Sequence, residues 1–474
     1  MLLTVDIGTS TFKSALWNFE GEILSSFFYP LTVKNEGIKH EAEPALWLNA
    51  FEYSLKQLSL NLNLKNLIDV KAVIISGNGP SLVPVLGSPD NKNRLYVPAK
   101  DAMLWLDRRA VNYQKIVSDV MGGFVDAGFF LPKILYIKNE DNELYNKTKC
   151  FIGCPEYLAY ALTGEAKTVF PCGGFDRWFW NNDVLDSLDL NQKKFPEFIQ
   201  PGGLFGEISG GVCDLLGFAH NTPVISGGPD FFAAILGSGV TKPGEACDRS
   251  GSSEGINLCT KNHINDIRLM SYRHPVKPFW NLSGIINTTG KAIEWGSGIL
   301  GFSGFDEFIK GAKESKKGSG GLIFNPYLMG ERSPLWNPSV RAVWSGIDIS
   351  TKRNDFANSI LEGISFAIKD VINVMEETGE KISELRATGK LSACGYLNQI
   401  KADITGISVI SAVNKEAELS GLAIIGTAAL GVYSSYEDAC LKIIKKDKIY
   451  EPDLKNTELY NNLFYKYQQN KEKN

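Results

Sequence analysis

The first residues of the chain alternate between apolar and polar positions as a β-hairpin does. Leu2–Ile7 is a nearly continuous apolar run, Gly8–Thr11 has the composition of a turn, and Phe12–Phe19 alternates well enough for a second strand. A third strand is expected over Glu22–Tyr29, and helical spacing of apolar residues follows over Trp47–Leu60. Strands that alternate with helices in this order predict an α/β layered fold.

A similar beginning recurs midway along the chain. Pro223–Ser226 is an expected strand, and Asp230–Leu236 is an expected apolar helix after a Gly-Gly-Pro turn. A second hairpin follows, with strands over Glu245–Arg249 and Ile256–Thr260 joined by the turn Ser250–Ser253. The repeated pattern predicts two related α/β domains, residues 1–242 and residues 243–474, with a cleft between them.

The composition of the 474 residues narrows the class of protein. Hydrophobic residues make up 44% and charged residues 22%, which is an ordinary globular balance. The net charge of −4, without a basic stripe, disfavours a nucleic-acid partner. The longest apolar segment, Leu422–Tyr433, is too short to span a membrane and is typical of a packed helix.

Cysteines and histidines give little support to a metal site. Of the eight cysteines, only Cys150 and Cys154 lie close together in the sequence, and neither has a second pair at zinc-like spacing. With only four histidines, a histidine-based metal cluster or a Ser-His-Asp triad is a poor explanation of the chain. The start of the chain has no basic segment before an apolar one, so we expect reduced thiols and a cytoplasmic location.

The turn of the first hairpin carries the first candidate chemistry. Asp6 ends a strand, and a glycine, three hydroxyl side chains and Lys13 follow it closely. Backbone N–H groups in such a turn form a concavity for anions, and a carboxylate can hold Mg²⁺ through water molecules. A hairpin with an ordinary polar turn explains this pattern equally well.

A second candidate is Asp230, at the start of the helix expected in the middle of the chain. Aspartate in this place is more often an N-cap than a catalytic group. The same geometry would also expose the carboxylate at the floor of a cleft, where it could accept a proton. The small-residue turns Ser250–Ser253 and Thr388–Cys394 could approach a phosphate or a flat ligand, although each is a weak signal alone. No P-loop sequence is present, so a nucleotide site would be of another kind.

Taken in order, these elements resemble the FGGY carbohydrate kinases of the actin, Hsp70 and sugar kinase superfamily. The similarity extends over nearly the whole chain, from Val5 to Tyr433. An N-terminal family signature is matched by Lys133–Glu140, with Tyr136 where the family usually has Trp. The segments that match the C-terminal signature and the stretch before it are Asn325–Pro334 (NPYLMGERSP), Ala342–Ile347 (AVWSGI), Asp355, Phe356 and Ser359–Glu362 (SILE).

This resemblance implies a fold of two ribonuclease H-like (actin-like ATPase) domains and the Mg²⁺-dependent transfer of phosphate from ATP to a sugar or polyol hydroxyl. Asp6 would organise Mg²⁺, and Asp230 would be the catalytic base. The positions that match nucleotide-binding residues of the family are Gly8, Thr9, Ser10, Thr11, Lys13, Gly251, Ser252, Gly290, Glu294, Gly389, Lys390 and Cys394. The positions assigned to the substrate are Asn78, Gly79, Pro80, Trp105, Asp107, Arg108 and Asp230.

Two departures from the family pattern affect these assignments. Lys390 replaces the second glycine of the adenosine motif, so its side chain either turns outward or crowds the nucleotide. After Asn78, xylulokinases carry Met-His and glycerol kinases Arg-Glu, whereas this chain has Gly79 and Pro80. The pocket floor should therefore be wider and less polar than in either group. For Asp107 and Arg108, a surface ion pair is as good an explanation as a sugar contact.

The leading interpretation is an ATP-dependent kinase of a small sugar or polyol, and a xylulokinase is the main alternative within that class. An ATP- and sugar-binding protein with little kinase activity is an alternative from another class, since Lys390 alters a family motif. An Hsp70-like or actin-like assembly ATPase is disfavoured, because the FGGY signature is specific to the sugar kinases. The sequence leaves open the sugar, the hydroxyl that is phosphorylated and whether the chain forms a homodimer.

Overall fold

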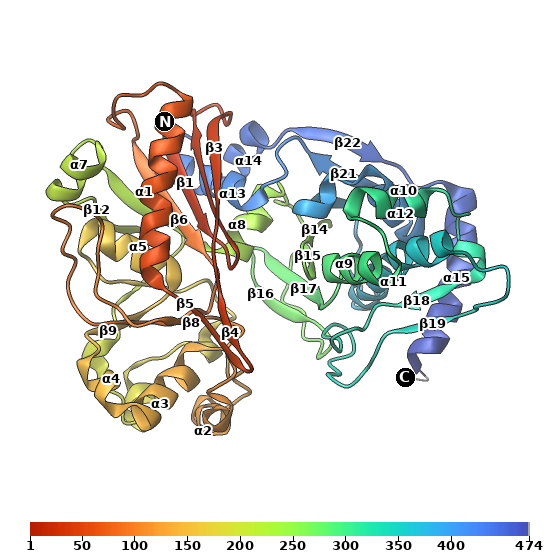
Figure 1. The fold of residues 1–474 in the computed structure, drawn as a ribbon, viewed down its shortest axis with the longest axis horizontal. Helices are drawn as coiled ribbons and strands as arrows, with labels where there is room; N and C mark the ends of the chain where they lie inside the picture. Colours follow the sequence, from red (N-terminus) through yellow and green to blue (C-terminus); the bar gives the residue numbers. More distant parts are fainter. Residues whose placement is uncertain (473–474) are drawn as a thin grey trace. The chain divides into compact units, whose positions relative to one another are not determined.

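The computed structural model describes residues 1–472, which fold as two compact units. Unit 1 comprises Met1–Gly237 and Glu418–Ile443, and unit 2 comprises Ser238–Ala417 and the residues from Ile444 onward. Each unit is built on one mixed β-sheet with helices packed against it (Figure 1). The expected α/β class is confirmed in both units.

The sheet of unit 1 has the strand order β12-β13-β6-β1-β2-β3. Strands β1, β6 and β13 are parallel neighbours, whereas β2 and β3 continue the sheet as an antiparallel meander from β1. The three parallel strands are near-continuous apolar runs because helices cover both of their faces. The strand bounds are β1 Leu2–Ile7, β2 Thr11–Trp17, β3 Ile23–Pro30, β6 Ala72–Gly77, β12 Leu204–Glu207 and β13 Pro223–Pro229.

Helices lie on both faces of this sheet. On one face, Ile75 of β6 belongs to a buried cluster with α1 (Pro44–Asn61) and α5 (Cys154–Thr163), which lie side by side in Figure 1. The preceding residue, Ile74, points to the opposite face and contacts α13 (Ala417–Ala429). Unit 1 also contains α8 (Asp230–Gly237) and α14 (Tyr436–Ile443).

A smaller layer of short strands and helices extends unit 1 beyond the carboxyl ends of its strands. Its short strands form the groups β4-β5-β8, β7-β9 and β10-β11. The strand bounds are β4 Lys34–Glu36, β5 Lys39–Ala42, β7 Val83–Val85, β8 Ala102–Met103, β9 Cys150–Ile152, β10 Thr168–Val169 and β11 Phe198–Ile199. The remaining helices of unit 1 are α2 Val111–Met121, α3 Phe130–Glu140, α4 Asn142–Lys147, α6 Asn182–Ser187 and α7 Gly210–Leu216.

The sheet of unit 2 repeats the pattern of unit 1. Its order is β16-β17-β15-β14-β20-β21-β22, with β14, β20 and β21 parallel and β15 and β17 continuing as an antiparallel meander. In both units a further antiparallel strand, β12 or β22, borders the last parallel strand. The predicted repeat of related α/β domains is therefore present in the strand order and directions. The bounds are β14 Glu245–Ser250, β15 Glu254–Thr260, β16 Met270–Arg273, β17 Trp280–Ile286, β20 Glu384–Thr388, β21 Val409–Ala412 and β22 Lys446–Tyr450.

The core of unit 2 is organised around the long helix α11. This helix spans Arg353–Glu377 and buries most of its central residues against neighbouring helices and the sheet. The family-like segments at residues 325 and 343 form a small antiparallel pair, β18 (Ile323–Asn325) with β19 (Val343–Ser345). The other helices of unit 2 are α9 Gly290–Ile299, α10 Phe305–Lys313, α12 Gly395–Thr405 and α15 Leu454–Glu472.

The division of the chain differs from the expected halves 1–242 and 243–474. The segment Glu418–Ile443 returns to unit 1, where α13 covers the face of the sheet that α1 and α5 leave open. Gly421 of α13 approaches α8 so closely that a Cβ atom would lie 1.8 Å from the carbonyl oxygen of Ala233. The chain therefore passes between the units three times. The expectation of a catalytic cleft between the domains stays a prediction.

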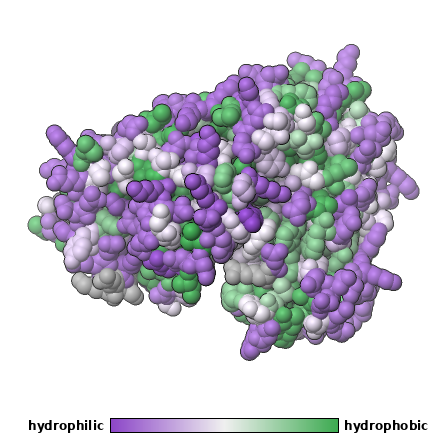
Figure 2. Space-filling model, turned by 180° about the vertical axis from the view of Figure 1, so that it is seen from behind, coloured by the Kyte–Doolittle hydropathy of each residue, from purple (hydrophilic) through white to green (hydrophobic). Residues whose placement is uncertain are grey.

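A helix that crosses a membrane needs a long apolar segment. In the part of the chain described here, no helix is both long and apolar enough to cross a bilayer. Figure 2 shows hydrophilic residues over most of one face, with hydrophobic residues scattered among them.

Candidate functional site

Three predicted site residues of unit 1 lie at the carboxyl ends of neighbouring parallel strands. Asp6 is near the end of β1, Asn78 directly follows β6, and Asp230 directly follows β13. The register of the sheet places Asp6 opposite Ser76, and Pro229 opposite Gly77. Ligands of open α/β sheets commonly bind outside the carboxyl ends of the strands. The sheet thus brings together residues that are far apart in the sequence.

The buried thiol of Cys154 shows how close the two carboxylates are. Burial raises the pKa of Cys154 well above its ordinary value, and the negative charges of Glu156, Asp6 and Asp230 raise it further. The amide Nδ2 of Asn78 lies 3.8 Å from the Cys154 sulfur. Asn78 therefore contacts the thiol at the start of α5, and Asp6 and Asp230 are near enough for their charges to act on it.

The first hairpin turn, residues 8–10, has the features expected of a phosphate-binding turn. The N–H of Gly8 donates to the carbonyl oxygen of Thr11 at 3.0 Å and closes the turn. A Cβ atom at Gly8 would lie 2.8 Å from that oxygen, so a larger residue would open the turn. Thr9 is half-buried and Ser10 is exposed.

Lys13 lies across the hairpin from Asp6 and contacts carboxylates. Its Nζ is 3.8 Å from Asp6 Oδ2 and 3.4 Å from Glu418 Oε2. Its ammonium group is only partly exposed, and Glu418 reaches it because α13 belongs to unit 1. Lys13 is therefore held beside the turn by charges of the same unit. Sequence reasoning missed Glu418, because it is far away in the sequence.

Asp230 occupies the first position of α8 and is half-buried. Its Oδ1 accepts a hydrogen bond of 2.6 Å from the N–H of the next residue, Phe231. An N-capping side chain typically accepts from the second or third N–H of the helix. The observed bond fixes the carboxylate at the strand end.

The sugar-side loop Asn78–Ser81 is tied down at its first residue. The backbone N–H and the side-chain Nδ2 of Asn78 both donate to the carbonyl oxygen of Ile7, at 2.8 and 2.9 Å. The Asn78 Oδ1 accepts from Ser81 Oγ at 2.5 Å. Gly79 is exposed and Pro80 is half-buried. The wider and less polar pocket floor expected from these two residues stays a prediction.

Trp105 connects the expected sugar side with the first turn. Its indole Nε1 donates to Thr9 Oγ1 at 3.1 Å, which places a half-buried aromatic ring beside the hairpin turn. Two residues on, Asp107 is fully buried and accepts hydrogen bonds from the backbone of His40 and from Arg109. Burial alone would raise the pKa of Asp107, but these hydrogen bonds outweigh it and lower the pKa.

The charged groups of Asp107 and Arg108, which were expected to contact the sugar, are both paired with other side chains. Arg109 occupies the Asp107 carboxylate, so the structure gives Asp107 a structural role. Arg108 is 43% exposed and donates from Nη1 to Asp126 Oδ1 at 2.6 Å, which is the surface ion pair considered as its alternative. A direct sugar contact by either residue stays a prediction.

In unit 2, a second set of predicted residues meets at the turn between β14 and β15. Gly251 donates its N–H to the carbonyl oxygen of Ser253 at 2.9 Å, and both Gly251 and Ser252 are exposed. The start of α9 is bonded to this turn, since Gly290 donates to the Gly251 carbonyl at 3.0 Å and Lys291 to the Ser252 carbonyl at 3.3 Å. The start of α9 therefore holds the turn through its carbonyl groups, while Gly251 and Ser252 stay exposed to solvent.

Two glycines allow the chain to approach this turn. A Cβ atom at Gly290 would lie 2.4 Å from the carbonyl oxygen of Gly251. At Gly389, which has a φ of +77°, a Cβ atom would lie 2.3 Å from the carbonyl oxygen of Ser250. Real Cβ atoms do not approach backbone oxygens so closely, so only glycine fits either place. The structure thus brings Gly251, Gly290 and Gly389 together.

The remaining nucleotide candidates surround this arrangement. Lys390 begins the short 3-10 helix Lys390–Ala393 and is exposed. Cys394 is half-buried between that helix and α12, and Glu294 is exposed on α9. The direction of the Lys390 side chain relative to a bound nucleotide stays a prediction.

A buried ion cluster lies beneath the unit 2 turn and was not found from the sequence. Lys401 of α12 donates to the carboxylates of Asp248 and Glu254, which flank the turn on β14 and β15. Burial would lower the pKa of Lys401, but the two carboxylates outweigh it and raise the pKa. All three side chains are fully buried, so the cluster braces the base of the hairpin.

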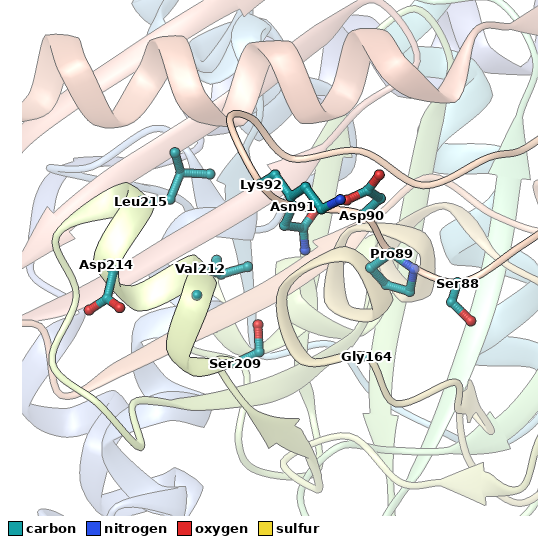
Figure 3. A pocket seen from close by; sticks show the side chains of 11 residues that line it. Ser88, Pro89, Asp90, Asn91, Lys92, Gly164, Ser209, Val212, Asp214 and Leu215 are labelled. Carbon is teal, nitrogen blue, oxygen red and sulfur yellow. The ribbon is translucent and has the colours of Figure 1, made fainter.

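An open depression of unit 1 is lined by other residues. Its volume is about 760 Å³, and it is bordered by the loop Ser88–Lys92 on one side and by α7 on the other. Figure 3 shows Asp90, Asn91 and Asp214 on its walls. None of the residues described as lining it is a predicted site residue.

Comparison with known proteins identifies the family of the chain. The N-terminal domain of the FGGY family of carbohydrate kinases matches residues 1–237, and its C-terminal domain matches residues 249–430. A xylulose kinase of Staphylococcus epidermidis is 26% identical over 99% of this chain and 96% of its own length. A gluconokinase of Bacillus subtilis is 24% identical over 92% of this chain and 89% of its own length.

Solved structures show the same fold. A gluconate kinase from Lactobacillus acidophilus superimposes with a TM-score of 0.84 at 22% identity, covering 99% of this chain and 96% of that one. A glycerol kinase from Plasmodium falciparum with ADP superimposes with a TM-score of 0.82 at 18% identity, covering 99% and 97%. The expected actin-like two-domain architecture is confirmed by these likenesses.

Proposed function

The chain belongs to the FGGY family of carbohydrate kinases, and we propose that its ATP-dependent phosphorylation of a sugar hydroxyl uses Asp230 as the general base. The observation that carries the assignment is the meeting of Asp6, Asn78 and Asp230 at the ends of three parallel strands. A carboxylate at such a position can receive the proton of a bound hydroxyl.

The proposed step needs one proton acceptor and well-placed phosphates. The sugar hydroxyl oxygen attacks the γ-phosphorus of ATP, and the bond from that phosphorus to the bridging oxygen of ADP breaks. The hydroxyl proton passes to the Asp230 carboxylate and later to solvent. Because phosphoryl transfer depends mainly on positioning and charge stabilisation, no covalent intermediate is required. The hydrogen bond from the Phe231 N–H supports this role, since it orients the carboxylate.

The phosphates are assigned to two exposed turns. In unit 1, the N–H groups and the hydroxyls of Thr9 and Ser10 supply donors, with Lys13 beside them. In unit 2, the exposed turn Gly251–Ser252 supplies the second set. The exposure of Lys390 gives its side chain room to turn away from a nucleotide, which favours an active kinase over a binding protein with little activity.

The residues at Asp6 fit a hydrated magnesium ion. Asp6 is 3% exposed, and among the described residues no three metal-ligating side chains cluster together. Mg²⁺ suits such a site because it keeps several waters and binds substrate phosphates alongside one or two carboxylates. We propose that Asp6 holds Mg²⁺ in this way. When bound, the ion neutralises charge on the phosphates.

Replacement of Asp6 tests the metal assignment. Asp6→Asn should raise the Mg²⁺ concentration for half-maximal activity by about tenfold, since a neutral amide holds hydrated Mg²⁺ less tightly. Steady-state kinetics at varied Mg²⁺ and constant ATP measures this change. An unchanged Mg²⁺ dependence would remove Asp6 from the metal site.

Xylulose is the first candidate substrate, because relatives of comparable identity over nearly the whole chain are named xylulose kinases. Gluconate is the second, because a gluconokinase is 24% identical. The loop residues Gly79 and Pro80 support a pocket floor without polar side chains, in which backbone groups and Asn78 bind the acceptor.

A coupled assay of ADP formation distinguishes these possibilities. Purified protein with ATP and Mg²⁺ is supplied in turn with D-xylulose, D-ribulose, D-gluconate and glycerol, and Asp230→Asn is the control for contaminating kinases. We expect one acceptor to stimulate turnover strongly over the acceptor-free rate. The absence of stimulation by every sugar, sugar acid and polyol in a wide panel would contradict the proposed function.

A further inference from the structure

A lysine with no exposed surface lies next to the sugar-side loop of unit 1. Lys133 is on α3, and its side chain is 0% exposed. Its Nζ donates to three carbonyl oxygens, those of Pro80 at 2.9 Å, Met103 at 3.1 Å and Leu104 at 2.8 Å. Lysine is almost never fully buried without compensation, because removing an ammonium group from water is costly. The three carbonyls supply that compensation.

The three carbonyls belong to the two segments assigned to the sugar. Pro80 is in the loop after β6, and Met103 and Leu104 lead from β8 into Trp105. Met103 and Leu104 have other donors as well, since their carbonyls accept from the N–H groups of Leu82 and Asp107, each at 2.9 Å. Within the described chain, Lys133 is the only hydrogen-bond donor recorded for the Pro80 carbonyl. Of the three carbonyls, that of Pro80 therefore depends most on the Lys133 ammonium group for a hydrogen bond.

Resting on the proposed function, we infer that Lys133 is a positioning residue for the phosphate acceptor. It holds the loop Asn78–Ser81 against the segment Met103–Trp105 and so sets the width of the sugar pocket without touching the sugar. The first end of the loop is fixed independently by Asn78 on Ile7. Loss of Lys133 should therefore loosen the Pro80 side of the loop and leave the strand end in place.

The charge environment makes this contact sensitive to pH. Burial lowers the pKa of Lys133 to about 7, and of the charges that face it, Asp107 and Asp126 raise the pKa while Arg108 and Arg109 lower it. Below this pH the ammonium donates three hydrogen bonds. Above it the amine has two N–H groups and a lone pair, which faces one of the carbonyls. The acceptor KM should therefore rise between about pH 6 and about pH 8.

The same group has a defined effect on stability. An unfolded lysine keeps its proton up to a pKa of about 10.4, whereas folded Lys133 releases it near 7. Between these values the unfolded state binds more protons, so this lysine makes the fold more stable as the pH rises through that window. A variant without the amine should lack this part of the pH dependence.

The test compares Lys133→Met with Lys138→Met, a matched control on the same helix. The control removes a lysine that pairs with Asp189 at the surface. With D-xylulose as acceptor, or D-gluconate if the substrate screen selects it, Lys133→Met should raise the acceptor KM by about tenfold. It should leave kcat and the KM for ATP within about twofold, and its acceptor KM should no longer change between about pH 6 and about pH 8.

Several results would overturn the inference. One is an acceptor KM that is unchanged in Lys133→Met, and another is an acceptor KM that still depends on pH in this variant. A third is a general defect, in which kcat falls and the KM values for acceptor and ATP rise to a similar extent. If Lys133→Met does not fold, Lys133→Arg and the pH profile of the wild-type acceptor KM remain as tests. The arginine keeps its charge at high pH, so the rise in acceptor KM should be flattened in Lys133→Arg. A wild-type acceptor KM that does not change with pH would contradict the inference. Wild-type protein without acceptor-dependent turnover would instead contradict the proposed function.

Discussion

At the scale of single residues, the direction of the Lys390 side chain separates two interpretations of the nucleotide site. The sequence shows a lysine where the family has glycine, and the letters alone do not say where its side chain points. In the structure it is exposed, while the neighbouring Gly389 makes the close approach to the turn of unit 2. The close approach therefore needs only one glycine.

Lys390→Gly should accordingly change ATP affinity by less than about threefold, because no clash is relieved. Isothermal titration of ATP into both proteins measures the difference. A gain of about tenfold on removal of the lysine, equivalent to about 1.4 kcal/mol, would show that the side chain crowds the nucleotide.

Asp107 shows what a residue motif cannot reveal. The sequence Asp107-Arg108-Arg109 contains one carboxylate and two cations, and only the three-dimensional path of the chain decides which cation meets it. Arg109 takes the buried carboxylate, and Arg108 turns to Asp126. Asp6 and Asp230, by contrast, could be placed near the ends of expected strands from the sequence, whereas their roles were implied only by the family resemblance.

At the scale of elements, the turn of unit 2 depends on the helix that supports it. The first N–H groups of α9 donate to Gly251 and Ser252, and Gly290 fits against the Gly251 carbonyl with no space for a methyl group. Hairpins and helices of this kind were predictable from apolar spacing and turn residues. Their docking was not, because it depends on the absence of a single Cβ atom.

Gly290→Ala should weaken ATP binding by at least about tenfold, since the new methyl group displaces the turn. Gly298→Ala on the same helix is the matched control, because no atom lies within 4 Å of a Cβ at that position. Titration calorimetry with ATP compares the two variants. Equal affinities would mean that the turn does not bind the nucleotide phosphates.

At the scale of the whole molecule, the return of residues 418–443 to unit 1 is the feature that the sequence did not reveal. The apolar segment Leu422–Tyr433 was correctly interpreted as a packed helix, but its partner could not be identified from spacing. Ile74 of β6 and Ala233 of α8 provide the packing surface, and both are distant in sequence. The repeat of strand order in the two units was predictable, since each hairpin has its own sequence pattern.

Gly421→Ala tests this packing. Its methyl group would meet the Ala233 carbonyl at 1.8 Å, so the free energy of unfolding should fall by about 1–3 kcal/mol, a typical cost of overpacking. Gly298→Ala, in an exposed place on α9, should be neutral or stabilise by up to about 1 kcal/mol. Urea denaturation measures both. A Gly421→Ala variant as stable as the wild type would contradict the close approach of α13 to α8.

The most direct test of the account is the turnover of Asp230→Asn with the acceptor that the screen selects. Asparagine has the same shape and can still accept the hydrogen bond from Phe231, but it cannot take the hydroxyl proton. The account predicts a fall in kcat on the order of 10²–10⁴-fold, with the ATP affinity measured by calorimetry unchanged within about twofold. A variant that keeps kcat within a factor of about three would contradict the assignment of Asp230 as the base.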